Sequence, residues 1–122
     1  MLKKKGFFCF TVTHPGWDLY EYSRKHFTGN SEIMPKIGPY FTRQYLAFMM
    51  NQSSIRTKVK KQFQVAHFQR PLEDYINGLI QTGFHLQKIA EPQIPLSLIN
   101  DFPEFKELKD YPISIVFLAQ RL

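Results

Sequence analysis

The chain has 122 residues and a mass of 14.5 kDa, the size of one domain, which excludes a two-domain enzyme. Hydrophobic residues make up 43% and charged residues 21%, without low-complexity tracts, so the chain is expected to fold. One cysteine excludes an internal disulfide, and four scattered histidines lack metal-ligand spacing, so we expect no metal site and a reducing compartment, the cytoplasm. No apolar run approaches the roughly 20 residues of a membrane helix, and the Lys-rich start lacks a signal-peptide cleavage site.

The positive charge is concentrated in the first half of the chain. Residues 1–61 hold 11 Lys or Arg against 3 Asp or Glu, whereas residues 62–122 hold 5 against 7. A basic half is compatible with an anionic partner such as nucleic acid, but the sequence favours a solvated surface over such a partner. Because the Lys-rich start is short and no nucleic-acid motif accompanies it, the sequence disfavours a nucleic-acid partner.

Two short runs of aromatic and β-branched residues predict strands. The first spans residues 7–13, between Gly6 and His14-Pro15, and the second spans residues 113–119, after Pro112. Neither run alternates strictly between apolar and polar residues, so both strands are expected to be buried on both faces inside a sheet. Cys9, within the first run, is expected to be inert packing.

An amphipathic helix is predicted between residues 71 and 83. Its apolar residues recur with helical period: Leu72, Tyr75, Ile76, Leu79 and Ile80. Pro71 suits the first helical position, and Gly83 is placed to end the helix in the left-handed conformation. Alternating segments predict a strand over 62–68 before the helix and another over 84–91 after it.

Two irregular segments remain. Residues 15–62 are rich in Tyr, Phe and Met, with one candidate helix over 40–50, and their length indicates an insertion or substrate lid rather than a plain loop. Residues 92–112 contain four prolines and a candidate short helix over 101–108, in a loop that joins two antiparallel strands. The expected organisation is a strand region over 1–14, the insertion over 15–62, a strand-helix-strand unit over 63–91, and the loop and final strand over 92–122.

These signals combine into an ordered set of motifs. In chain order they are Leu2-Lys3-Lys4-Lys5-Gly6, the first strand, His14-Pro15, Arg70-Pro71-Leu72, Thr82-Gly83-Phe84 and the final apolar strand. This order resembles the C-terminal half of a class I S-adenosylmethionine-dependent methyltransferase of the small-molecule, ubiquinone-biosynthesis-like type. That family carries a Leu-Lys-Pro-Gly-Gly turn, often a His-Pro, then an Arg-Pro-Leu helix ending in Ala-Gly-Phe. Here the departures from the family pattern are Lys5, Phe7, Gln69 and Thr82.

The resemblance implies an α/β fold. It would be a partial Rossmann-like sheet with strands five, seven and six in that order, the last strand antiparallel, one well-defined helix and a long insertion. The implied cofactor is S-adenosylmethionine, which the family holds with a glycine-rich turn and an acidic residue at the end of its second strand. Neither feature is present in this sequence, so we expect that the chain lacks the cofactor-binding N-terminal half and does not bind the cofactor alone.

Six residues are candidates for a substrate site. His14 follows the carboxyl end of a predicted strand, where open α/β sheets bind ligands, although a turn histidine bonded to the backbone is the alternative. Arg70 is a candidate for holding an anionic substrate group, or is a solvated arginine. His67 alternates with Phe68, so only one of the two is expected to face the pocket. The remaining candidates, for the pocket lining or the core, are Trp17, Tyr20 and Tyr40.

Two functions of different class follow. The first is the substrate-side portion of a small-molecule methyltransferase, inactive alone. The second is a non-catalytic oligomerising or interaction module, with a basic RNA-binding module as a more distant alternative. In a chain without the N-terminal half, the strand over 7–13 becomes an open edge, so we expect a homo-oligomer. Copies would pair through this strand or exchange the 15–62 segment, and a missing N-terminal half is the other expected partner.

Overall fold

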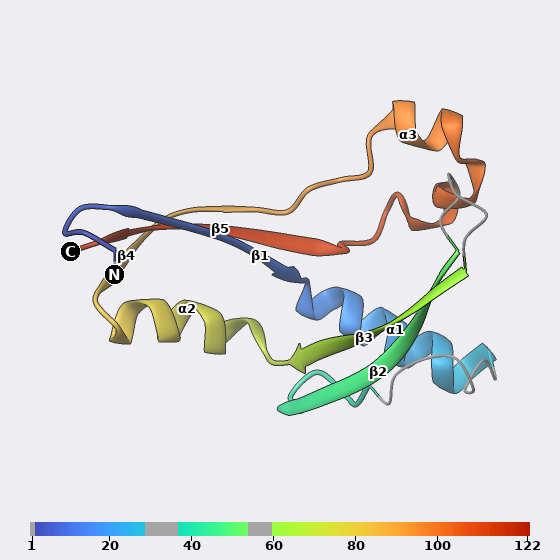
Figure 1. The fold of residues 1–122 in the computed structure, drawn as a ribbon, viewed down its shortest axis with the longest axis horizontal. Coiled ribbons are helices and arrows are strands. Elements are labelled where there is room, and N and C mark those ends of the chain that lie inside the picture. The colour runs from blue at the N-terminus through green and yellow to red at the C-terminus, as the bar shows by residue number, and fades with distance from the viewer. Residues whose placement is uncertain (1, 29–36, 54–59) are drawn as a thin grey trace.

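The computed structural model describes residues 2–28, 37–53 and 60–122. The elements are β1 (Phe7–Thr13), α1 (Pro15–Thr28), β2 (Gln44–Ser53), β3 (Lys60–Gln69), α2 (Leu72–Gln81), β4 (Phe84–Ala90), α3 (Leu96–Asp101), the 3-10 helix η1 (Pro103–Leu108) and β5 (Ser114–Arg121) (Figure 1). Within these ranges, no helix has the length and apolarity that crossing a membrane requires.

The strands form two separate antiparallel sheets. β5 lies between β1 and β4 in a three-stranded sheet, and β2 pairs with β3 in a two-stranded hairpin. Figure 1 shows α1 continuing from the end of β1, and the hairpin lying beside α1 rather than joining the larger sheet. The combination of helices with an antiparallel sheet confirms the coarse α/β class expected from the sequence.

The hydrophobic core lies between the three-stranded sheet and α2. Its buried members are Leu79 of α2 and Ile115, Phe117 and Ala119 of β5. These β5 residues alternate with half-buried ones, so only one face of the central strand is fully covered, and the expectation of burial on both faces is wrong for this strand. Burying each large apolar side chain contributes about 1.5–3 kcal/mol to the free energy of folding. The packing of α2 on β5 is therefore a main source of stability in this fold.

The helix α2 forms where the apolar period predicted it. It begins at Leu72, so Pro71 is the N-cap with an extended backbone rather than the first helical residue. Gly83 has a φ of 85°, which confirms the left-handed ending, and its N–H donates to the carbonyl of Ile80 at 3.2 Å. Directly after this turn, β4 confirms the strand expected there.

β1 contradicts the expectation of a strand buried on both faces. Phe7 is 60% exposed, Phe8 is 43% exposed, and Cys9 is exposed rather than packed. Within the described residues, β1 pairs with β5 on one side only and is therefore an edge strand. An apolar run predicts that a strand is shielded from solvent, but it does not identify the polypeptide that shields it.

Residues 15–62 contain more regular structure than the sequence predicted. They hold α1 and β2, and the helix expected over 40–50 is wrong because Gln44–Ser53 is a strand. These residues pair one for one with Lys60–Gln69, and this cross-strand pairing decides the conformation of a segment with no clear period of its own. β3 overlaps and confirms the short strand expected over 62–68.

The connection between β4 and β5 contains two short helical segments. The single helix expected over 101–108 is instead α3 followed by η1, with Phe102 between them. β4 and β5, the strands that this connection joins, are antiparallel, which confirms the pairing expected from the sequence.

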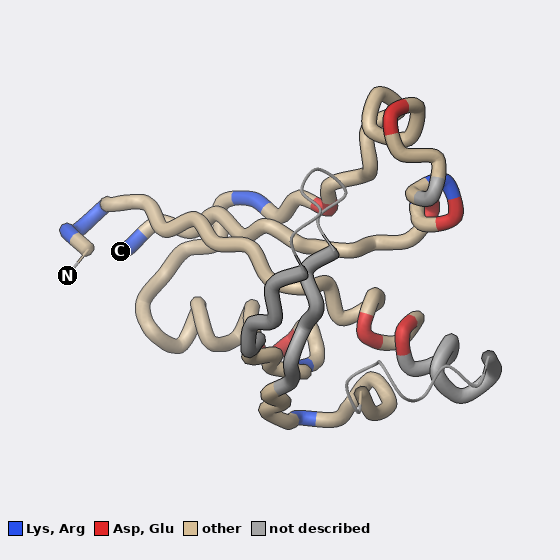
Figure 2. The backbone as a smooth tube through the Cα atoms, turned by 45° about the vertical axis from the view of Figure 1, so that its right-hand side comes forward, with Lys and Arg blue, Asp and Glu red and all other residues tan. Residues whose placement is uncertain are grey.

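Charge is distributed unevenly over the described backbone. Figure 2 shows basic residues gathered where the chain begins, beside the C-terminus, and acidic residues on α1 and around η1. The two acids of α1 are Asp18 and Glu21, which are only 3% and 5% exposed. A buried carboxylate is costly unless hydrogen-bond donors or positive charges lie beside it. The two carboxylates of α1 therefore require such groups on neighbouring elements.

Candidate functional site

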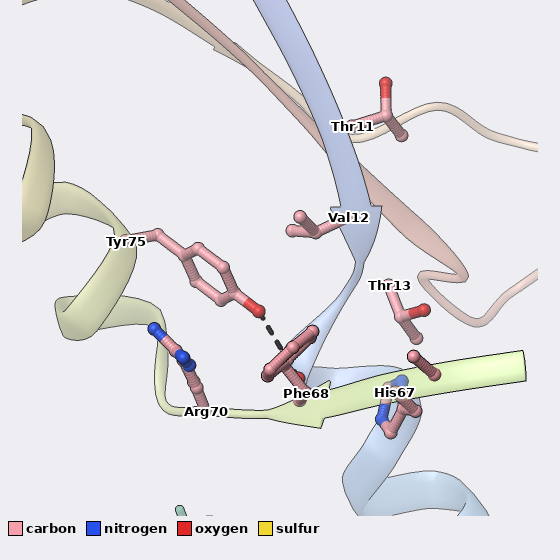
Figure 3. A pocket seen from close by; sticks show the side chains of 8 residues that line it. Thr11, Val12, Thr13, His67, Phe68, Arg70 and Tyr75 are labelled. Carbon is pink, nitrogen blue, oxygen red and sulfur yellow. Dashed lines mark hydrogen bonds between the residues drawn. The ribbon is translucent and has the colours of Figure 1, made fainter. Parts of the chain in front are cut away.

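A pocket of about 420 Å³ lies where the end of β1 meets the end of β3 (Figure 3). This volume is within the range that holds small organic molecules. The lining comes from both strands and from the start of α2: Thr11, Val12, Thr13, Ala66, His67, Phe68, Arg70 and Tyr75. The position at the carboxyl end of β1 is one at which open α/β sheets bind ligands.

The pocket runs along strand edges rather than over one face of a sheet. The N–H of His14 donates to the carbonyl of Ile113 at 3.0 Å, and the alternation of an antiparallel ladder then turns the N–H and C=O of Thr11 and Thr13 away from β5. Consecutive residues of each strand therefore reach the pocket. The expectation that only one of His67 and Phe68 would face it is wrong, because both line it.

His67 faces a buried carboxylate. Its Nε2 lies 3.0 Å from Oδ1 of Asp18, and the two side chains are 14% and 5% exposed. The atoms are at ion-pair distance, but they are not aligned as a hydrogen bond, and neither has another hydrogen-bond partner among the described residues. His67 therefore faces the buried Asp18 carboxylate across the interface between α1 and β3.

An arginine and a tyrosine line the same pocket as His67. The guanidinium carbon of Arg70 lies 5.3 Å from the ring centroid of Phe68, in cation–π contact. The hydroxyl of Tyr75 donates to the carbonyl of Phe68 at 3.5 Å, as Figure 3 shows. Burial raises the pKa of Tyr75, so its hydroxyl remains protonated at neutral pH.

His14 lies outside this pocket and bonds to other parts of the chain. Its Nδ1 accepts from the N–H of Gly16 at 2.8 Å, and its Nε2 lies 2.8 Å from Oε2 of Glu91. Because Nδ1 is an acceptor, the ring proton is assigned to Nε2, which donates to the carboxylate. This is the arrangement of a turn histidine bonded to the backbone, the alternative that the sequence left open.

The three aromatic candidates also lie away from the pocket. Trp17 and Tyr20 have ring centroids 5.2 Å apart, and Tyr20 stacks on Tyr111 at 4.0 Å. The hydroxyl of Tyr40 accepts the N–H of Leu72 at 3.2 Å and thereby caps the first turn of α2. Trp17 and Tyr20 therefore join α1 to the end of the β4–β5 connection, and Tyr40 supports the helix that carries Tyr75.

The pocket thus brings together two of the six candidates, His67 and Arg70. Sequence reasoning missed Asp18 and Tyr75. Asp18 lies in the first turn of a helix that no period predicted, and the only signal for it was an acid a few residues after a strand. Tyr75 was placed on the apolar stripe of α2, and only its residue type indicated that a hydroxyl extends beyond that stripe.

A glutamine at the end of β3 fixes the segment before β2. Gln69 is 1% exposed, and its Oε1 accepts from the N–H of Gly38 at 3.0 Å and from Nε2 of Gln44 at 2.7 Å. Its own Nε2 donates to the carbonyls of Gly38 at 2.7 Å and Pro39 at 3.2 Å. Because Gln69 immediately precedes Arg70, this network also fixes the backbone that presents the arginine.

An ion pair joins the same segment to α2. Arg43 donates from Nε and Nη2 to both oxygens of Asp74, at 2.8 and 2.9 Å, and from Nη2 to Glu73 at 3.1 Å. The bidentate hydrogen bonds from Arg43 lower the pKa of Asp74. Both acids lie in the first turn of α2, where their negative charge interacts favourably with the positive end of the helix dipole. Arg43 pairs with them at the same position.

Neither the glycine that follows β1 nor the acid that follows β4 is open to a ligand. The turn that follows β1 contains Gly16, but a Cβ there would lie 3.0 Å from the His14 ring and 3.2 Å from Pro112, so the chain's own side chains fill the space. Glu91, the acid that follows β4, is bonded to His14 instead of facing an open site. In the same ranges, no cluster of three or more His, Cys, Asp or Glu is arranged to hold a metal ion.

Comparison with known proteins gives matches in structure alone. No family model and no curated protein matches the sequence. A proposed S-adenosylmethionine-dependent methyltransferase from Listeria monocytogenes has a TM-score of 0.61 and 24% identity, over 99% of this chain and 50% of that one. An S-adenosylmethionine-dependent methyltransferase from Mesorhizobium loti has a TM-score of 0.60 and 19% identity, over 98% of this chain and 50% of that one. The chain therefore has a methyltransferase-like fold and spans half the length of these structures.

Proposed function

We propose that this chain is the substrate-side portion of an S-adenosylmethionine-dependent methyltransferase that acts on a small molecule, and that it is inactive alone. The observation that carries the proposal is the fold match over nearly the whole chain to half of two such proteins. In this assignment, β1, β5 and β4 are strands five, seven and six of a larger sheet. The pocket at the end of β1 is then the acceptor site, with His67 and Arg70 in its wall.

The proposal that the chain is inactive alone is supported by two features of the described residues. The turn after β1 is filled by His14 and Pro112, and Glu91 is occupied by His14. Cofactor binding is therefore assigned to a complementary half, which in the larger sheet would pair with the free edge of β1.

Equilibrium dialysis with labelled S-adenosylmethionine tests this assignment. The chain alone should retain no cofactor. A mixture with the half of the Listeria protein that this chain does not cover should associate, as measured by calorimetry, and should retain cofactor. Micromolar binding by the isolated chain would overturn the inactivity, and a mixture without association or cofactor binding would overturn the methyltransferase assignment.

The free edge of β1 favours self-association when no complementary half is present. Exposed Phe7, Phe8 and Cys9 lie along it, and natural proteins rarely leave such an edge uncovered. We propose that two copies pair along β1 across a two-fold axis, with exchange of the 15–62 segment as the competing arrangement. This edge is also the observation that favours the second candidate function, a non-catalytic oligomerising module.

Sedimentation equilibrium at tens of micromolar protein measures the association directly. Edge pairing predicts a dimer that a short thiol-to-thiol cross-linker captures through Cys9, the only cysteine of the chain. Segment exchange predicts a dimer without that cross-link, and a stable 14.5 kDa monomer would contradict both arrangements.

A further inference from the structure

A second pocket, of about 410 Å³, lies beside the pocket at the end of β1, here called the acceptor pocket. Phe68 and Arg70 line both pockets, and Figure 3 shows these two side chains from the side of the acceptor pocket. The other residues that line the second pocket come from the start of β2, from the residue before it and from α2: Arg43, Gln44, Tyr45 and Asp74. The proposed function gives this second pocket no role.

Two exposed aromatic rings form the apolar part of the second pocket. Tyr45 and Phe68 are cross-strand partners in the hairpin of β2 and β3, and their ring centroids lie 5.0 Å apart. The two residues are 58% and 50% exposed. Because aromatic rings stack on planar molecules, exposed rings that line a pocket offer a surface for a planar ligand.

Arg70 supplies a positive charge that no acid among the described residues neutralises by contact. Its guanidinium carbon lies 5.3 Å from the Phe68 ring centroid, and no described residue forms a hydrogen bond or an ion pair with it. Asp74 lines the same pocket, but both of its oxygens accept from Arg43, at 2.8 and 2.9 Å. Arg43 also lowers the pKa of Asp74 more than Arg70 does. With Arg43 and Asp74 paired, the lining keeps one net positive charge, at Arg70.

The backbone on both sides of the second pocket is held by hydrogen bonds within the chain. Gln69, which is 1% exposed and precedes Arg70, accepts from Nε2 of Gln44 at 2.7 Å. Arg43, next to Gln44, is bound to α2 through Asp74. A pocket with fixed walls loses little conformational freedom when a ligand binds, so more of the contact energy contributes to affinity.

We propose that the second pocket binds a planar aromatic ligand that carries a carboxylate, with its ring against Tyr45 and Phe68 and its carboxylate at Arg70. A guanidinium pairs with a carboxylate through two parallel N–H···O hydrogen bonds, which a neutral substituent on the same ring does not match. Because the Arg70 guanidinium lies beside the Phe68 ring, one small molecule reaches both. The proposal rests on this pocket alone and does not depend on the methyltransferase assignment.

A titration of the isotope-labelled full chain with 2-naphthoate, followed by two-dimensional NMR, tests the site because it measures the affinity and locates the ligand. We expect the largest shifts at the amides of Tyr45, Phe68 and Arg70. The neutral analogue 2-naphthamide has the same rings and should bind about fivefold more weakly, the upper range for one exposed ion pair. Arg70→Gln should weaken 2-naphthoate binding by about the same factor and abolish the preference over the amide.

Tyr45→Thr tests the aromatic wall. It removes one ring, keeps a β-branched residue in the strand, and should weaken the binding of both ligands about fivefold. The matched control for Arg70→Gln is Lys88→Gln, which removes a positive charge from an exposed position on β4 outside the pocket and should leave both affinities unchanged.

Three results would overturn the proposal: no binding of 2-naphthoate, equal affinity for 2-naphthamide, or unchanged affinity in Arg70→Gln. Largest shifts at residues 11–13, which line the acceptor pocket and not the second pocket, would overturn it as well. The amide spectrum of each variant shows whether it is folded, and Tyr45→Thr decides if Arg70→Gln is not. The assay contains neither cofactor nor a complementary half, so its failure is distinguishable from failure of the complementation test.

Discussion

Replacing Gln69 by methionine should destabilise the chain far more than an exposed glutamine replaced in the same way. The new side chain has nearly the same length and fills nearly the same space, so the change isolates the hydrogen bonds. It removes the acceptor of the Gly38 N–H and of Gln44 Nε2, and the donor to the carbonyls of Gly38 and Pro39. Gln69 is 1% exposed, so water does not simply replace these partners.

The size of the loss follows from the number of bonds. A net hydrogen bond contributes about 0.5–1.5 kcal/mol, and three of the four lost bonds are 3.0 Å or shorter, so we expect a loss of about 2–4 kcal/mol in the free energy of unfolding. Gln44→Met removes one of these bonds and should cost about 1 kcal/mol. Gln87→Met, on an exposed side chain of β4, should stay within about 0.5 kcal/mol of the parent.

Urea unfolding followed by circular dichroism measures all three variants, with the slope of the transition as a check that the unfolded state is unchanged. A Gln69→Met variant as stable as Gln87→Met would refute the argument that this amide network holds the segment before β2. Restored stability in Gln69→Glu at low pH, where the carboxyl is protonated, would support a role for the hydrogen bonds rather than for side-chain shape.

Further predictions concern α2 and its surroundings. Gly83→Ala should lower the stability by about 1 kcal/mol because its φ is 85°, whereas Gly78→Ala, inside the helix and with open space around its Cβ, should raise it by about 1 kcal/mol; thermal unfolding of both gives the two signs. Tyr40→Phe should cost about 1 kcal/mol in urea unfolding, since it removes the hydroxyl that caps α2. Arg43 lowers the pKa of Asp74 in the folded state, so this carboxylate stabilises the fold above its ordinary pKa of 3.8, and the contribution is lost as the pH falls through the lowered pKa. The stability difference between the parent and Asp74→Asn should therefore shrink at successive pH values below 3.8, and a difference that persists there would contradict the ion pair as its cause.

The parts of the fold that could be predicted are those whose signals are complete within a few residues. α2 carries its own apolar period, and Gly83 supplies the backbone conformation that ends it. β4 begins directly after Gly83 because the turn contains no further loop residues. By contrast, β2 was read as a helix because its conformation depends on β3, which lies further along the chain, and local propensity does not contain that pairing.

The same distinction explains the candidate site. His67 and Arg70 were identifiable because they flank the end of a predicted strand just before a predicted helix. Asp18 was not, because its role depends on α1 lying against β3, a tertiary contact without a sequence signature. His14 looked suitable from its position after β1, but its own backbone neighbour, Gly16, occupies the nitrogen that a ligand would need.

The separation of the two sheets has a consequence for how such a chain can change its ligand over evolutionary time. No backbone ladder joins the hairpin to the three-stranded sheet within the described ranges, so the wall that β3 contributes can be rebuilt without changing the register of β1, β5 and β4. Insertions, new aromatic side chains or a different tilt of the hairpin would alter the shape of the pocket, while the seven-residue free edge of β1 keeps its pattern of peptide groups. The pocket wall and the free edge of β1 therefore lie in regions that can diverge at different rates.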